Sequence, residues 1–194
     1  MNKVFNFSFE NSLGFSHSGE VAVEGEGQVE LTETEVQQLV DLIRSHDGSS
    51  DVEELKLKET YPELYAKLDD ACRDAAHHAE WIHWVIEGYE CSYYEVDTED
   101  AISKCEERYG YSHEFDKDKF LEENPDYDED DIDEDVIADE ASEAFENWVE
   151  EYRETLTPDE EASFLADVFE LDPDLSLVDY EVVIPEEIVR MAEG

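Results

Sequence analysis

The chain has 194 residues and carries 58 Asp and Glu against 12 Lys and Arg, a formal net charge of −46 at pH 7. This net charge is larger than solubility requires, and the repulsion among so many acids destabilises a compact state. Such a charge argues against direct binding to nucleic acid, because phosphate would be repelled, and against an anionic membrane surface for the same reason. No apolar run in the sequence is long enough to span a bilayer.

The apolar composition predicts a folded core beneath the acidic side chains. Leu, Ile, Val and Phe make up about 24% of the chain, more than is typical of disordered proteins. Three Trp, ten Tyr and nine Phe add large apolar side chains. Cys72, Cys91 and Cys105 are odd in number and form no Cys-x-x-Cys motif, so we expect reduced thiols and not a disulfide framework.

The first 31 residues predict strands. Residues 4–9 alternate between apolar and polar side chains, and residues 14–19 supply turn chemistry. Further strand is expected over 20–24 and 28–31, with Gly25 and Gly27 marking a bend or bulge between them.

Helical signals dominate the rest of the chain. Thr32 followed by Glu35 is a capping-box pattern, and the helix that it opens should end near Gly48. Pro62 starts a long helix with one apolar face, which should end near Gly88. Further helices are expected over about 97–110 and 117–123, after 135, from 158 and from 185, and a last strand over 175–184. Thr157 and Glu160 form a second capping-box pattern, at the start of the helix from Pro158.

These patterns predict an α+β fold with a small antiparallel sheet of the N-terminal strands, several helices packed on it and a very acidic surface. The segment 175–184 is a candidate third strand. Charge divides the chain into residues 1–119, with the strands and the long helix, and an acidic helical region, residues 120–194, within the same domain. The acidic region has a net charge of −27, more than half of the total.

The helix expected after residue 135 is the candidate binding surface. Its outward acids recur in steps of three and four residues, which places carboxylates on one side about 5–6 Å apart along the axis. Duplex DNA presents one charge per ~1.7 Å of its axis, so a rigid row of carboxylates can stand in for phosphates. The predicted partner-binding residues are Asp128, Glu129, Asp130, Asp131, Asp133, Glu134, Asp135, Asp139, Glu143, Glu146, Glu150 and Glu154.

In charge and size, the chain resembles phage and mobile-element proteins that mimic nucleic acid, among them anti-CRISPR and anti-restriction proteins. No family motif carries the resemblance. It implies an inhibitor that binds the cationic nucleic-acid cleft of a host defence protein, such as a CRISPR effector or a restriction enzyme, in the host cytoplasm. Two alternatives stay open, an acidic chaperone or carrier of basic proteins and a globular protein adapted to high salt.

Catalytic and metal-binding patterns are weak. A calcium loop counted from Asp126 would have Asp131 at position six, where glycine is needed, and Ile137 at position twelve. Glu80 and His83 form a single Glu-x-x-His step, whereas di-iron sites need two. No nucleophile elbow or phosphate-binding glycine loop occurs. We therefore expect no enzyme, metal or cofactor, and Trp81 and Trp84 belong either to the core or to an interface.

Overall fold

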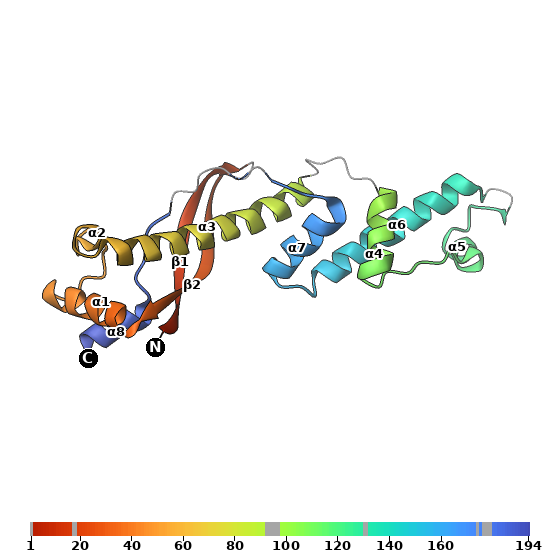
Figure 1. Ribbon diagram of the computed structural model, residues 1–194. Coiled ribbons are helices and arrows are strands. Elements are labelled where there is room, and N and C mark those ends of the chain that lie inside the picture. Colours follow the sequence, from red (N-terminus) through yellow and green to blue (C-terminus); the bar gives the residue numbers. More distant parts are fainter. Residues whose placement is uncertain (1, 17–18, 92–97, 130–131, 174, 176–179) are drawn as a thin grey trace. The chain divides into compact units, whose positions relative to one another are not determined.

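Two antiparallel strands, β1 (Asn2–Ser16) and β2 (Gly19–Thr32), form the sheet of the computed structural model, which describes residues 2–16, 19–91, 98–129, 132–173, 175 and 180–194. Side chains are described for all of these except residues 10–16 and 19–24. Eight helices accompany the strands in the described residues, which confirms the α+β class (Figure 1).

The chain divides into two compact units. The first comprises Met1–Trp84 and Asp174–Gly194, and the second is Val85–Pro173. The chain passes from the first unit to the second inside helix α3 (Pro62–Glu90) and returns after Pro173, so the division by charge at residue 119 is not the division by packing. Each unit has its own buried apolar side chains and is described by itself.

The sheet of the first unit buries one face. Phe5 and Phe7 of β1 are buried, as are Val29 and Leu31 of β2, whereas Asn6 between the two phenylalanines is exposed. This alternation is the two-residue period predicted from the sequence. The buried face packs on the long helix α3 and on α1 (Glu33–Ser45) and α8 (Glu186–Glu193), through residues that include Leu39, Ile43, Leu64, Leu68 and Ile188.

The expected bulge at Gly25 and Gly27 was wrong. Both glycines stay in register, opposite Phe9 and Phe7, and the irregularity lies between Leu13 and Phe15. A Cβ at Gly27 would lie 2.2 Å from the Phe7 ring and 2.9 Å from the Ala75 Cβ. The glycines therefore leave room for aromatic rings that cross the strand pair.

The expected third strand over 175–184 was also wrong in the part that the structure describes. Residues 180–184 pair with neither strand, and residues 176–179 lie outside the described residues. Val183 instead meets α3, where its backbone N–H lies 3.5 Å from the Cys72 sulfur. Ile184 is buried in the core, so burial on a helix replaces ladder hydrogen bonds here.

Local capping signals located most helix starts correctly. Thr32 and Glu35 form the predicted capping box of α1, and Thr157 and Glu160 form that of α7 (Pro158–Phe169). The second unit also contains α4 (Thr98–Arg108), α5 (Lys117–Glu123) and α6 (Glu134–Arg153). A four-residue helix, α2 (Leu57–Thr60), lies in the first unit. No helix among the described residues is long and apolar enough to cross a membrane.

Replacing Gly27 by alanine should lower the free energy of unfolding of the first unit by about 1–3 kcal/mol, because the buried Phe7 ring must leave its place. Urea unfolding followed by amide resonances of the strands measures the loss. Gln28→Ala, at the exposed neighbouring position, should change stability by less than about 0.5 kcal/mol. Equal stability of Gly27→Ala and the parent would show that the close approach is not needed.

Candidate acidic interface

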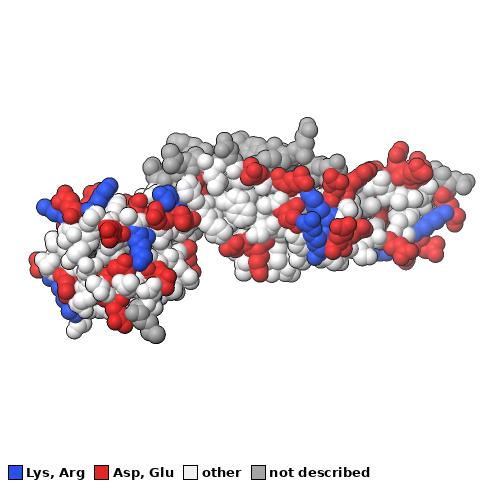
Figure 2. Space-filling model, in the orientation of Figure 1, with Lys and Arg blue, Asp and Glu red and all other residues white. Residues whose placement is uncertain are grey.

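The second unit carries most of the excess charge. Residues 85–173 contain 34 acids and five Lys and Arg, a net charge of −29 out of −46. The remaining 105 residues, in the first unit, carry −17. Figure 2 shows carboxylate side chains spread over the visible face, with few lysines and arginines among them.

Every lysine and arginine of the second unit is in an ion pair inside that unit. All five of these Lys and Arg residues lie in the described part of the chain. The pairs are Lys104 with Glu170, Arg108 with Asp167, Lys117 with Glu129, Lys119 with Glu123, and Arg153 with Glu90, Glu150 and Glu161. No cation of this unit is left to neutralise its other acids.

Arg153, at the end of α6, is shared by three carboxylates from three helices. Its Nε donates to Glu161 at 2.8 Å, and its Nη1 and Nη2 donate to Glu150 at 3.0 Å and Glu90 at 3.2 Å. The guanidinium also lies 4.8 Å from the centre of the Tyr89 ring. Burial alone would lower the pKa of Arg153, but the hydrogen bond that it donates to Glu161 and the charges of Glu150 and Glu161 raise it above its usual value. Arg153 therefore stays positively charged.

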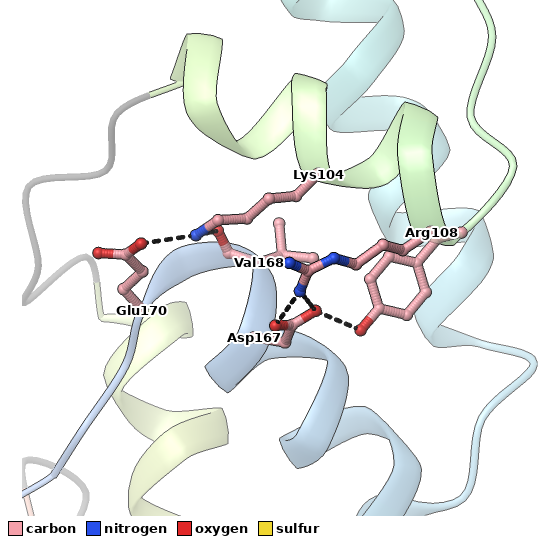
Figure 3. A network of polar contacts seen from close by, with 6 residues as sticks. Lys104, Arg108, Asp167, Val168 and Glu170 are labelled. Atoms are coloured by element: carbon pink, nitrogen blue, oxygen red, sulfur yellow. Dashed lines mark hydrogen bonds and ion pairs between the residues drawn. The ribbon is translucent and has the colours of Figure 1, made fainter.

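A second polar network joins α4 to α7 (Figure 3). The Arg108 Nη1 donates to both Asp167 oxygens, at 2.6 and 2.9 Å, and the Tyr109 hydroxyl donates to Asp167 at 2.8 Å. These hydrogen bonds from Tyr109 and Arg108 lower the pKa of Asp167. Burial, with the bond to Asp167, raises the pKa of Tyr109 to about 12. Lys104 completes the network with Glu170 at 2.7 Å.

The outer face of α6 carries the predicted row of carboxylates. Asp139, Glu143, Glu146 and Glu154 are exposed, and none forms an ion pair with a Lys or Arg of the described residues. Glu150 belongs to the same row but pairs with Arg153. From Asp139 to Glu150 the row extends over about 16 Å at 1.5 Å per residue. It is thus a line of fixed negative charge on one rigid helix.

Aromatic packing behind α6 holds this row in place. Phe145 and Val149 are buried, while Trp148 and Tyr152 stack with ring centroids 5.0 Å apart. Tyr152 also contacts the buried Phe164 of α7 at 5.0 Å. The opposite side of the helix is therefore fixed against neighbouring helices, and the acids cannot turn inward.

Before α6 and in its first turn, the predicted residues have different roles. Asp133 caps the helix, accepting hydrogen bonds from the backbone of Asp135 and Val136 at 3.1 Å each. Glu129 pairs with Lys117. Asp128, Glu134 and Asp135 are exposed, and the last two lie in the first turn, where the helix dipole favours acids. Asp130 and Asp131 lie outside the described residues.

Comparison of the chain with protein-family models, curated proteins and solved structures found no match. The interpretation of the acidic face therefore rests on its own charge, exposure and pairing.

Sequence reasoning missed Glu90 and Glu161 as members of the Arg153 cluster. A signal existed, because Arg153 is the only basic residue between Lys119 and Arg190. A single arginine among so many acids is expected to form ion pairs with several of them. Which acids do so depends on contacts as distant in sequence as Glu90 and Arg153, 63 residues apart.

The histidine and tryptophan cluster of α3 is a packing feature of the first unit. Glu80 is buried, and the Trp84 indole donates to it at 3.3 Å. His78 stacks on Trp81 at 5.9 Å, and His83 meets Trp84 edge-on at 5.0 Å. Trp81 and Trp84 are half-buried. Within the described residues, no three His, Cys, Asp or Glu side chains are grouped so as to hold a metal ion.

Replacing Asp167 by asparagine should lower the free energy of unfolding by about 1–2 kcal/mol at pH 7, since the charge-assisted bonds from Arg108 and Tyr109 are weakened at a partly exposed site. The folded state lowers the pKa of Asp167, so its contribution is present above the unfolded pKa, about 4, and is lost as pH falls through the folded value. The gap between parent and variant should therefore be constant from about pH 7 to 5 and shrink below about pH 4.

Urea unfolding followed by amide resonances of α7, repeated across pH, measures this gap. Asp172→Asn removes the same charge at an exposed position and serves as the control. Equal stability of the two variants at pH 7, or a gap that stays unchanged at pH 3, contradicts the assignment.

Proposed function

We propose that this chain inhibits a nucleic-acid-binding host defence protein, such as a CRISPR effector or a restriction enzyme, by occupying its cationic cleft in place of nucleic acid. The action is stoichiometric binding between proteins in the host cytoplasm. The outer face of α6 would make the contact.

One observation carries the proposal: the second unit uses all five of its cations internally and still exposes a row of acids, of which only Glu150 pairs with a described Lys or Arg. Like charges at this spacing destabilise a helix, so the row is not explained by stability. A protein needs far less charge than this to remain soluble, so solubility does not explain the row either. The exposed acids therefore favour a partner of opposite charge.

The physics of capture would follow that of DNA itself. A cleft built to neutralise phosphates exchanges its condensed anions for the carboxylates, so affinity falls steeply with salt. Complementary fields also speed the encounter at low salt. The row on α6 is less dense than a DNA strand, with about 5–6 Å between acids against 3.4 Å between charges. Rigidity compensates in part, because the carboxylates are already ordered before binding.

Reversing the charge of the α6 row tests the proposal. The triple variant Asp139→Lys, Glu143→Lys and Glu154→Lys leaves Glu150 with Arg153 and should keep the fold. The measurement is inhibition of DNA cleavage by purified restriction enzymes and CRISPR effectors. For any enzyme that the parent inhibits, the Kd of the triple variant should be at least about tenfold higher. The salt dependence of binding should become shallower.

The matched control is Glu26→Lys, Glu30→Lys and Glu59→Lys, which makes the same change in net charge on exposed residues of the first unit. Equal loss in both triple variants would mean that only the overall field matters. If no nuclease is inhibited, while histones and other basic proteins are bound equally well, the chain is a carrier of basic proteins and the proposal fails.

Salt dependence of folding separates the proposal from adaptation to high salt. We expect both units to be folded at about 0.15 M salt, where charges still interact over about 8 Å. The second unit, with −29, should gain more thermal stability than the first between about 0.01 and 0.15 M salt, as repulsion is screened. Thermal unfolding followed by amide resonances of each unit measures both. A second unit that folds only in molar salt would favour the halophilic alternative.

A further inference from the structure

A cavity of about 630 Å³ opens in the second unit beside Arg153. Its walls come from the last turn of α3, the C-terminal half of α6 and the end of α7, and Thr98 of α4 also lines it. Tyr89, Phe145 and Phe169 supply aromatic surface, and Val149 and Leu171 supply aliphatic surface. The cavity therefore combines an apolar interior with a charged border.

The border of the cavity is negative. Glu90, Glu146 and Glu150 line it, and Arg153 is its one cation among the described lining residues. Glu146 forms no ion pair with a described Lys or Arg, so its charge is not compensated. Burial raises the pKa of the Tyr89 hydroxyl, and the charges of Glu150 and Glu146 raise it further, against the opposite effect of Arg153. The local field therefore favours cations and disfavours anions.

Arg153 shows what these walls can bind. Its guanidinium lies over the Tyr89 ring at 4.8 Å and donates to Glu90 and Glu150. Each carboxylate accepts up to about four hydrogen bonds, so one arginine does not saturate the group. A planar cation can stack on an aromatic face while donating to carboxylates, which is the combination that guanidinium suits best.

We propose that this cavity is a guanidinium site that takes an arginine side chain of the protein partner, next to the chain's own Arg153. That the arginine comes from a protein partner rests on the proposed function, but guanidinium binding by the cavity does not. A phosphate-binding cleft is rich in arginine, so the partner of a nucleic-acid mimic has such a side chain to offer. The cavity would then anchor one residue, while the α6 row supplies the general field.

The first experiment measures the site alone, with no partner. N-acetyl-arginine amide is titrated into the full chain at low salt, and amide and side-chain resonances of Val149 and Leu171 report binding. We expect saturable binding in the millimolar range. N-acetyl-citrulline amide has nearly the same shape without the charge, and N-acetyl-lysine amide has the charge without the planar group. Citrulline should not bind, and lysine should bind more weakly than arginine.

Two variants of α6 separate a built site from a general field. Glu146→Gln removes a charge from the border, whereas Glu143→Gln removes the same charge from the same helix outside the cavity. Binding of N-acetyl-arginine amide should weaken about threefold in Glu146→Gln and stay nearly unchanged in Glu143→Gln. Circular dichroism of both variants confirms that the helix is kept. Equal weakening in the two variants, or equal binding of arginine and citrulline, overturns the proposal.

The partner arm uses any enzyme that the parent chain inhibits. Glu146→Gln should reduce affinity for that enzyme more than Glu143→Gln does. If arginine amide binds as expected but the two variants inhibit equally, the site stands and its use by the partner fails. If no enzyme is inhibited, the proposed function fails, and the titration alone still decides whether the cavity binds guanidinium.

Discussion

Repulsion among carboxylates is the constraint that shapes the second unit. Its 89 residues carry a net charge of −29, and each of its five Lys and Arg pairs with at least one acid of the same unit. Arg153 joins α3, α6 and α7 through Glu90, Glu150 and Glu161, and Arg108 joins α4 to Asp167 of α7. These two arginines thus lie at junctions between helices, whereas Lys119 pairs with Glu123 within α5. A surface of unpaired acids is what remains when the cations are used in this way.

Aromatic burial supplies the attraction that the charges oppose. Trp148, Tyr152 and Phe164 are in mutual ring contact behind α6, and Tyr111 packs against both Phe145 and Trp148. Large rings bury much apolar area for each residue, which suits a unit with few other means of stabilisation. The same rings keep the helix rigid. The function that we propose depends on that rigidity, because a flexible acidic tail would lose entropy on binding and a packed helix does not.

The first unit is built around a two-stranded sheet that is covered on one face by helices. In the part of the chain that the structure describes, its two strands pair only with each other, and their buried face is covered by α3, α1 and α8. Gly25 and Gly27 give the rings of Phe9 and Phe7 space across the strand pair. With a net charge of −17 over 105 residues, this unit has less negative charge per residue than the second unit. It therefore offers control positions against which the acidic face can be tested.

By itself the sequence determined what depends on neighbouring residues. The capping boxes at Thr32 and Thr157, the alternation around Phe5 and the outward acids of α6 were predicted because turns and periods are local properties. Only the tertiary structure decided which charges are paired, where the units divide and that residues 180–184 rest on α3 without strand pairing. The candidate row was thus readable, whereas the Arg153 cluster and its cavity were not, since they join helices distant in sequence. Periodicity shows which side of a helix is polar, but burial against other helices decides which acids stay free.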